Sequence, residues 1–205
     1  MQHGHLYIIS APSGAGKTSL VKALLDNMDN IMVSVSHTTR PKRDGETHGV
    51  NYYFVEKTEF ESMLAENTFL ESATVFGNYY GTSKTWVESQ LSQGIDVILE
   101  IDWQGAEKVR KLMPDAINIF ILPPSKQVLS QRLYGRGTDA EEVIQRRLDA
   151  AMDEMRHCHE FDYLIVNDDF DLALQELQAI IKTQRLTQSV QKQHLAPLLK
   201  ELLAT

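Results

Sequence analysis

Ala11-Pro12-Ser13-Gly14-Ala15-Gly16-Lys17-Thr18 is the stretch of sequence that decides the fold. It follows the apolar run Leu6–Ser10, which predicts a buried strand, and it leads into Lys17–Asn27, whose apolar residues recur at helical spacing. A glycine-rich turn between a strand and a helix is the Walker A arrangement, with Ala11 where the pattern has glycine. The sequence therefore predicts a phosphate-binding loop at the end of a buried strand.

The residue types in this loop suit a nucleoside triphosphate. Backbone N–H groups of such a loop converge on phosphate oxygens, and the helix that follows adds the positive end of its dipole. Lys17 is placed to reach the β- and γ-phosphates, and the hydroxyl of Thr18 is placed to bind Mg²⁺. The alternative is a glycine-rich turn that matches the pattern by chance, which the flanking strand and helix disfavour. No guanine-reading Asn-Lys-x-Asp motif is present, which argues against a GTPase.

Strand-like and helix-like segments alternate along most of the chain, which predicts an α/β fold with a parallel sheet covered by helices on both faces. The segment from Arg40 to about Thr82 differs, because it is polar and rich in Tyr and Gly. We expect a single domain over residues 1–205, with a core formed by residues 1–36 and 83–205. Residues 37–82 then form an inserted subdomain, and residues from about 134 to 147 form a lid.

The strand predicted at Asp96–Ile101 ends in acidic residues. Glu100 and Asp102 are two positions apart, so they point the same way, beyond the carboxyl end of the sheet, where ligands of α/β proteins bind. The pair is interpreted as a Walker-B-like site that serves Mg²⁺ or the acceptor. The alternative is that both acids are simply solvated.

Four arginines lie within sixteen positions of this acidic chain: Arg132, Arg136, Arg146 and Arg147. Arg136 stands between Gly135 and Gly137, which suits a lid that closes over transferring phosphates, and arginine binds oxyanions bidentately. The alternative is a solvated helical face paired with acidic neighbours, and it suits Arg146 best. We predict catalytic roles for Arg136 and Arg147, together with Lys17.

The overall composition limits the classes of function. The 205 residues carry a net charge of −8, which argues against a general binder of nucleic acid or of anionic membranes. Cys158 is the only cysteine, so an intramolecular disulfide is excluded. No run reaches the length of a transmembrane helix, and the first ten residues do not resemble a signal peptide, so the expected location is the cytoplasm.

Several separate segments, in the same order, resemble guanylate kinases from about Tyr7 to Arg185. The phosphate loop departs from the common family pattern only at Ala11. Besides that loop, the matching segments are Ser36-His37-Thr38-Thr39-Arg40-Pro41-Lys42-Arg43, Gly49-Val50-Asn51-Tyr52-Tyr53-Phe54, Gly77-Asn78-Tyr79-Tyr80-Gly81-Thr82, Leu99-Glu100-Ile101-Asp102-Trp103-Gln104-Gly105 and Arg132-Leu133-Tyr134-Gly135-Arg136-Gly137-Thr138.

The resemblance implies a GMP site in the inserted subdomain. Its phosphate-binding residues would be Arg40, Arg43, Tyr52 and Tyr80. Glu71 would accept hydrogen bonds from the guanine N1–H and 2-amino group, and Ser36 and Thr82 would supply hydroxyls that complete base recognition. Asp102 would lie near the acceptor base or ribose, and Arg147 would contact the GMP phosphate.

The resemblance also implies the donor site. Arg132 would face the ATP phosphates with Arg136 and the eight residues of the loop, and Asn167 would sit beside the ATP adenine. Glu100 would lie nearer than Asp102 to Mg²⁺, the cofactor that accompanies ATP. The implied reaction is transfer of the γ-phosphoryl group of ATP to GMP or dGMP in purine nucleotide metabolism, with small molecules as the only substrates.

Two alternatives stay open at this point. A related P-loop kinase would act on another phosphorylated acceptor, such as a ribose phosphate. A guanylate-kinase-like domain that binds phosphorylated peptides would do no chemistry, and it would be expected to have a damaged phosphate loop. The leucines near the carboxyl end fall at helical spacing, with Pro197 in a first turn, which fits either a docked helix or a contact in a homo-oligomer.

Overall fold

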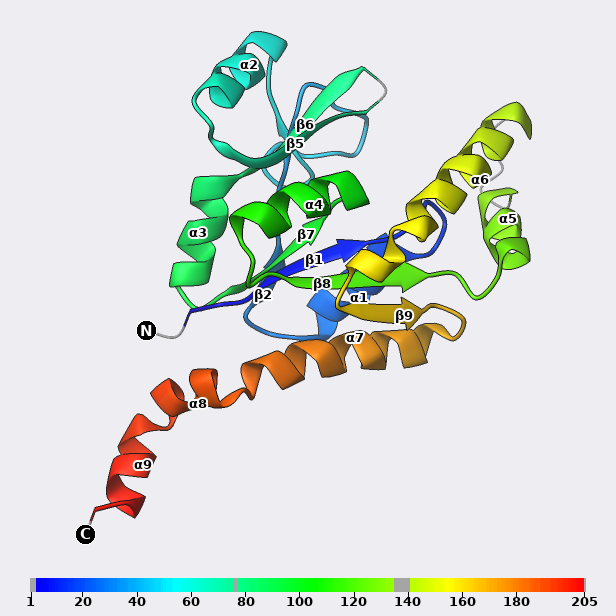
Figure 1. Cartoon of the computed structure of the whole chain (residues 1–205). Helices are drawn as coiled ribbons and strands as arrows, with labels where there is room; N and C mark the ends of the chain where they lie inside the picture. The colour runs from blue at the N-terminus through cyan, green and yellow to red at the C-terminus, as the bar shows by residue number, and fades with distance from the viewer. Residues whose placement is uncertain (1–2, 76, 135–140, 205) are drawn as a thin grey trace.

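The computed structural model describes residues 3–75, 77–134 and 141–204, and its central feature is a five-stranded sheet (Figure 1). All its neighbouring strands are parallel, in the order β2-β7-β1-β8-β9. The strands are β1 Leu6–Ser10, β2 Ile31–Val33, β7 Asp96–Glu100, β8 Ile117–Leu122 and β9 Tyr163–Val166. The predicted α/β class with a parallel sheet is therefore confirmed.

Helices cover both faces of this sheet, which explains why β1 is buried at every position. Tyr7 and Ile9 point to one face, where they pack with residues of α1 Lys17–Asn27 and α7 Phe170–Arg185. Leu6 and Ile8 point to the other face, toward α3 Lys84–Ser92 and α4 Trp103–Leu112. Side chains alternate along a strand, so a strand buried on both faces does not alternate between apolar and polar residues.

A second sheet, of four strands, lies above the first in Figure 1 and has the order β4-β3-β6-β5. Its strands are β3 His37–Thr38, β4 Tyr53–Phe54, β5 Phe69–Val75 and β6 Asn78–Ser83, and α2 Lys57–Ala65 packs against it. A Cβ atom at Gly81 would lie 2.8 Å from the Phe69 ring and 3.0 Å from the Phe60 ring, so only glycine fits there. The sequence predicted short strands in this segment but not the helix α2.

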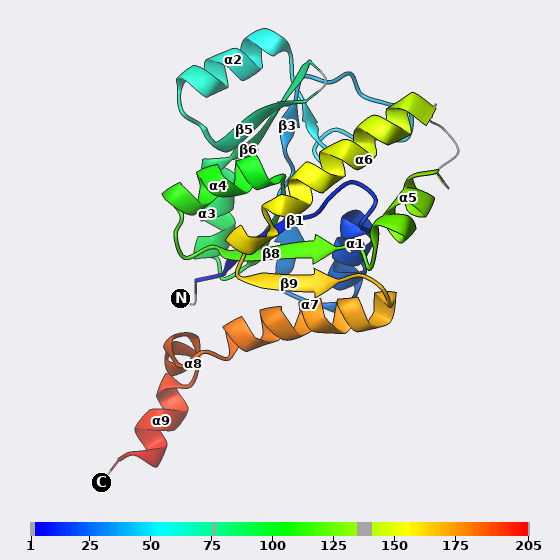
Figure 2. The same ribbon diagram turned by 45° about the vertical axis from the view of Figure 1, so that its right-hand side comes forward.

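Two further helices stand at the carboxyl ends of the core strands. They are α5 Lys126–Tyr134 and α6 Glu141–Arg156, which share the small apolar cluster of Leu129, Leu133 and Ala151. In Figure 2, α6 extends from the core sheet toward the level of the smaller sheet. The predicted lid residues between these helices, 135–140, lie outside the described residues.

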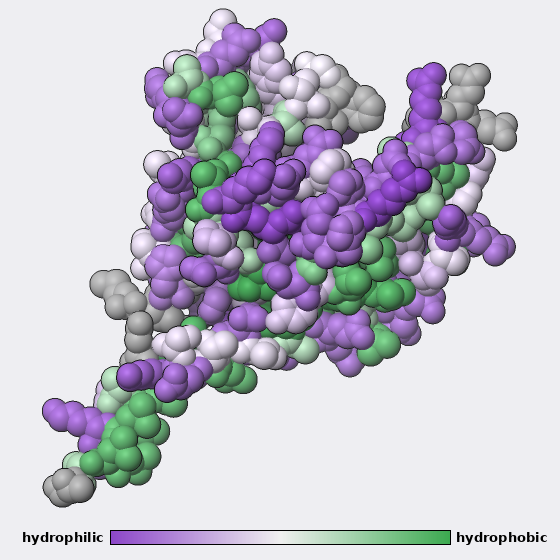
Figure 3. Space-filling model, viewed as in Figure 1, coloured by the Kyte–Doolittle hydropathy of each residue, from purple (hydrophilic) through white to green (hydrophobic). Residues whose placement is uncertain are grey.

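The carboxyl-terminal segment extends away from the body of the chain (Figure 1), although Ser189 and Val190 line a cavity together with core residues such as Leu6 and Leu91. Helices α8 Gln188–His194 and α9 Ala196–Leu202 project away from the body of the chain in both views (Figures 1 and 2). Pro197 lies in the first turn of α9, as expected. Leu198, Leu202 and Leu203 are exposed, and Figure 3 shows this apolar surface over α9. None of the helices in the described ranges combines the length and apolar character of a membrane span.

Candidate active site

The predicted phosphate loop joins the carboxyl end of β1 to the first turn of α1. Gly14 and Gly16 adopt the left-handed region, with φ of 93° and 95°. The loop surrounds a hollow of about 180 Å³ lined by residues 11–14 and 16–19. Unpaired N–H groups and the dipole at the start of a helix make such a hollow favourable for an anion. The local structure therefore matches the chemistry expected from the sequence.

Asn167 supports the backbone of this loop. Its buried side chain donates from Nδ2 to the carbonyl of Ala15 at 2.7 Å, and a Cβ atom at Gly16 would lie 2.3 Å from the same nitrogen. Arg132 donates from Nη2 to the backbone carbonyl of Asn167 at 3.0 Å, while its Nη1 is buried with no hydrogen-bond partner among the described residues. Asn167 thus contacts the loop backbone directly, and Arg132 contacts Asn167.

Lys17, Thr18 and Glu100 meet at the mouth of the loop. Lys17 Nζ lies 3.7 Å from Glu100 Oε2, and the Thr18 hydroxyl donates to the same oxygen at 3.4 Å. Burial lowers the pKa of the Lys17 ammonium, and the nearby Glu100 carboxylate opposes that shift. The hydroxyl and the carboxylate are the oxygen ligands that Mg²⁺ prefers, so these two residues fit the predicted ion.

A cleft of about 420 Å³ joins the core to the smaller sheet. Predicted residues from both parts line it: Lys17, Ser36, Tyr52, Glu71, Tyr80, Glu100 and Asp102. Segments that are far apart in the sequence therefore contribute to one continuous space. The cleft extends from the phosphate loop to the smaller sheet.

Glu71 is the most deeply buried acid of this cleft, with 7% of the residue exposed. It follows an irregularity in the pairing of β5 with β6, and its Oε1 accepts a hydrogen bond from the Thr82 hydroxyl at 2.8 Å. Burial raises the pKa of Glu71, the Thr82 hydrogen bond opposes the shift, and Asp102 raises the pKa further. A buried carboxylate with one partner has room to accept hydrogen bonds from a ligand.

Asp102 serves first as the N-cap of α4. Its Oδ1 accepts a hydrogen bond from the Gly105 backbone at 2.7 Å. A Cβ atom at Gly105 would lie 3.3 Å from Glu71 Oε2 and 3.4 Å from Asp102 Oδ1, so glycine keeps the space beside both carboxylates open. The capping role fixes the direction of Asp102 without removing it from the cleft wall.

Arg40, Tyr52 and Tyr80 form the predicted phosphate cluster. The Arg40 guanidinium lies 5.4 Å from the centroid of the Tyr52 ring, and the Tyr52 and Tyr80 rings are 5.9 Å apart. Glu46, which the sequence interpretation missed, pairs with Arg40 Nη2 at 2.6 Å and accepts a hydrogen bond from the Arg43 backbone at 2.8 Å. The Arg43 side chain is exposed on the same turn.

Arg147 reaches the phosphate loop from α6. Its Nη2 donates to the Ser13 hydroxyl at 2.7 Å. The other predicted catalytic arginine, Arg136, lies outside the described residues. Glu154 on the same helix also lines the cleft, and no motif pointed to it. A signal was available, because Glu154 lies seven positions after Arg147, which is the spacing of one helix face.

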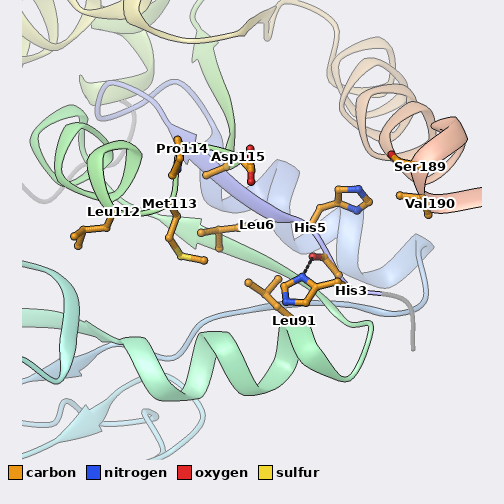
Figure 4. A pocket seen from close by; sticks show the side chains of 12 residues that line it. His3, His5, Leu6, Leu91, Leu112, Met113, Pro114, Asp115, Ser189 and Val190 are labelled. Carbon is orange, nitrogen blue, oxygen red and sulfur yellow. Dashed lines mark hydrogen bonds between the residues drawn. The ribbon is translucent and has the colours of Figure 1, made fainter. Parts of the chain in front are cut away.

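A cavity larger than this cleft lies at the opposite end of the core sheet (Figure 4). It has a volume of about 480 Å³ and is lined mainly by apolar residues, among them Leu6, Leu91, Leu112, Met113 and Val190. It lies at the amino end of β1, whereas α/β proteins bind ligands at the carboxyl ends of their parallel strands. The smaller cleft beside Lys17 is therefore the candidate active site.

The sheet order, the loop and the cleft define a P-loop α/β protein of the nucleotide kinase type. A family model described as guanylate kinase matches residues 3–184. A guanylate kinase of Methylococcus capsulatus is 60% identical over 203 residues, covering 99% of this chain and 100% of the relative. One from Escherichia coli is 56% identical over 206 residues, covering 100% of both chains.

The solved structures agree. The crystal structure of guanylate kinase from Anaplasma phagocytophilum has a TM-score of 0.75 and 34% sequence identity, and the match covers 92% of this chain and 89% of that one. The chain belongs to the guanylate kinase family. The resemblance stated from the sequence is therefore confirmed.

Proposed function

We propose that this chain transfers the γ-phosphoryl group of ATP to GMP and dGMP, giving ADP and the diphosphate, and that the cleft beside Lys17 is where it does so. The proposal rests on one observation: residues of the core and residues of the inserted subdomain line the same cleft. Lys17 and Glu100 come from the core, and Glu71, Tyr52 and Tyr80 come from the smaller sheet. Phosphoryl transfer depends mainly on positioning and on charge stabilisation, which such a cleft supplies.

The donor side holds ATP through the loop of residues 11–18 and the charge of Lys17. Thr18 and Glu100 would hold Mg²⁺, which neutralises charge on the β- and γ-phosphate oxygens. Arg132, Arg136 and Arg147 add positive charge around the transferred group, where it stabilises developing charge. Asn167 keeps the loop in shape through its hydrogen bond to Ala15, and the family resemblance implies that it would also sit beside the adenine.

The acceptor side binds GMP with Arg40, Arg43, Tyr52 and Tyr80 on the phosphate and with Glu71 on the base. Guanine presents two donors, N1–H and the 2-amino group, to the buried Glu71 carboxylate, while Ser36 and Thr82 supply hydroxyls. Adenine lacks these donors, so it would leave Glu71 buried and charged without a partner. A site built this way can reject the wrong base by roughly 10⁴-fold.

The two sides belong to parts that close toward one another. Residues 37–82 carry the acceptor, and residues from about 134 to 147 form the lid. Closure on double occupancy would exclude water, which otherwise hydrolyses ATP. Small-angle scattering should show smaller dimensions with ATP analogue and GMP together than without ligands, and equal dimensions would contradict this part of the proposal.

The proposed partners are small molecules in the cytoplasm, and a net charge of −8 does not suit binding to nucleic acid or anionic membranes. The exposed leucines of α9 support a homo-oligomer. Sedimentation of the chain and of a Leu202→Glu variant should show a larger species only in the unchanged chain.

The function is tested by an assay that couples ADP release to ATP·Mg²⁺ turnover with GMP, dGMP, AMP, CMP and UMP as acceptors. Turnover should be confined to GMP and dGMP. Turnover with another phosphorylated acceptor alone would favour the related kinase. No turnover, with retained binding of a phosphorylated peptide, would favour the non-catalytic domain.

A further inference from the structure

Glu71, the acid proposed to read the acceptor base, lines two hollows of the molecule. One is the cleft beside Lys17. The other is a pocket of about 340 Å³ where α2, β5 and α4 come together, and the side chains that line it include Lys108 and Lys111 of α4. Glu71 therefore has substrate-binding groups on one side and cationic side chains of a core helix on the other.

Lys108 links the strand that carries Glu71 to the core. Its Nζ donates to the backbone carbonyl of Ser72 at 2.8 Å, and Ser72 directly follows Glu71 in the chain. Strand β5 is the edge strand of the smaller sheet, so along one side it has no neighbouring strand to bond with. A charge-assisted hydrogen bond from a core helix therefore holds this edge strand next to the base-reading residue.

The same face of α4 also approaches the Glu71 carboxylate. Gly105 and Lys108 are three residues apart, so they are neighbours on one face of the helix. A Cβ atom at Gly105 would lie 3.3 Å from Glu71 Oε2, which shows how closely the helix backbone approaches this oxygen. Figures 1 and 2 both show α4 between the core sheet and the smaller sheet. The position of the carboxylate therefore depends on how β5 is held against α4.

The charges around Glu71 give Lys108 a second effect. Besides the two tyrosines of the cleft, the ionisable groups described that share the cleft or the pocket with Glu71 are Lys17, Glu100, Asp102, Lys108, Lys111 and Glu154. Burial raises the pKa of Glu71 and Asp102 raises it further, whereas the Thr82 hydrogen bond and the Lys108 ammonium lower it. The donors of guanine need an ionised carboxylate, so the charge of Lys108 favours guanine binding.

We propose that Lys108 is a positioning residue for recognition of the acceptor base: by holding β5 against α4 at Ser72, it fixes the Glu71 carboxylate in the wall of the cleft. Lys108 is among the residues that line the pocket and not among those that line the cleft, so it acts on the acceptor through Glu71. The inference rests on the proposed function, since it assumes that Glu71 reads the base of GMP.

The test compares the kinetics of the full chain with those of three variants. Lys108→Met keeps the length of the side chain but removes its charge and its donor, so KM for GMP should rise about threefold to tenfold, while kcat and KM for ATP stay unchanged. Lys108→Arg keeps a charge and donors and should restore most of the affinity for GMP. Lys111→Met is the matched control. It removes the same charge from the same helix and pocket, where Lys111 pairs with Glu107 at 2.7 Å, and KM for GMP should stay within about twofold.

The pH dependence separates an effect through Glu71 from general support of the fold. Inhibition by guanosine needs the ionised Glu71 carboxylate, and loss of the Lys108 charge raises the pKa of that group. As the pH falls, the inhibition should therefore fade at a higher pH in Lys108→Met than in the unchanged chain. In a Glu71→Gln background, Lys108→Met should leave the pH profile where it is.

Three results would overturn the proposal: an unchanged KM for GMP in Lys108→Met, an equal rise of KM for GMP and for ATP, or an equal rise of KM for GMP in Lys108→Met and Lys111→Met. An unshifted pH profile in Lys108→Met, or no restoration in Lys108→Arg, would also count against it. If Lys108→Met fails to fold, Lys108→Gln, which keeps a donor without the charge, should change KM and the pH profile in the same directions. Absence of GMP turnover in the unchanged chain would instead overturn the proposed function.

Discussion

The donor side and the acceptor side of the cleft are built in different ways. The donor loop is one continuous segment of eight residues, held between β1 and α1, and its binding groups are largely backbone N–H groups. The proposed acceptor side takes most of its residues from positions 36 to 82, spread over several short strands and turns, and its expected binding groups are side chains. We therefore expect the donor side to tolerate Ala11 and the acceptor side to depend on particular side chains.

The two sides also differ in how firmly they are anchored. Strand β1 is fully buried between two layers of helices, so it holds the start of the following loop rigidly in place. Between residues 37 and 82, Phe60 of α2 and Leu70 of β5 are the only buried hydrophobic residues described, and Leu70 packs with the main core. Ring stacking such as Phe60 on Phe69, with centroids 4.6 Å apart, joins α2 to the smaller sheet. Regions with few buried apolar contacts open and move more easily. The difference suits a fixed donor site and a movable acceptor site.

The largest effect is expected from Lys17→Ala, which removes the principal charge of the donor side. Turnover should fall by about a thousandfold, because the charge that meets the transferring phosphate is lost. The coupled ADP-release assay measures this, and circular dichroism checks the fold. Lys22→Ala, an exposed position on the same helix, serves as the control and should retain full activity. Turnover close to normal in a folded Lys17→Ala variant would contradict the assignment of Lys17 to the ATP-binding side.

A smaller effect is expected from Glu71→Gln, which tests base reading on the acceptor side. The loss of a charge-assisted hydrogen bond, about 1.5–3 kcal/mol, should lower kcat/KM for GMP by about tenfold to a hundredfold. AMP should gain, because the new amide can donate to adenine N1, and KM for ATP should stay unchanged. Glu61→Gln, on the exposed face of α2, is the control. An unaltered preference for GMP over AMP would show that Glu71 does not read the base.

Arg40→Lys tests the acceptor phosphate cluster. Lysine keeps the charge but loses the planar fork that binds a phosphate bidentately, so KM for GMP should rise by about tenfold. Inhibition by guanosine, which has no phosphate, should be unchanged. Lys42→Ala, at an exposed neighbouring position, is the control. If guanosine and GMP weaken equally, Arg40 supports the structure of the cleft rather than the phosphate.

The smallest effect is a pH dependence that belongs to the acceptor side alone. Burial raises the pKa of Glu71 above its ordinary value of 4.5, so the folded chain takes up this proton more readily than the unfolded chain does. Protonation stabilises the fold as the pH falls, but it removes an acceptor from guanine. Inhibition by guanosine should therefore weaken several-fold at mildly acidic pH. It should not do so in Glu71→Gln, and an identical pH profile in both proteins would contradict the role of Glu71.

The fold was predictable where the pattern is local and long. The buried strand Leu6–Ser10 and the helix Lys17–Asn27 were expected with the bounds that the structure shows, because continuous apolar runs and helical spacing carry the signal. The smaller sheet was harder. Its strands β3 and β4 have two residues each, too few to show a period, and α2 has only nine residues, with Phe60, Met63 and Leu64 at a helical spacing that the sequence interpretation missed.

The sequence by itself determined the phosphate loop, since the pattern that identifies it lies within eight consecutive residues. The sequence also determined the family, because several motifs of guanylate kinases occur in it in the same order as in that family. Only the tertiary structure placed Glu46 against Arg40 and Glu154 in the cleft with Lys17, because each of these acids meets its neighbours through folding. The same holds for Asn167, whose contact with Ala15 joins residues 152 positions apart. Local backbone geometry is encoded locally, whereas the burial and the partners of a charged side chain are set by the packing of distant segments.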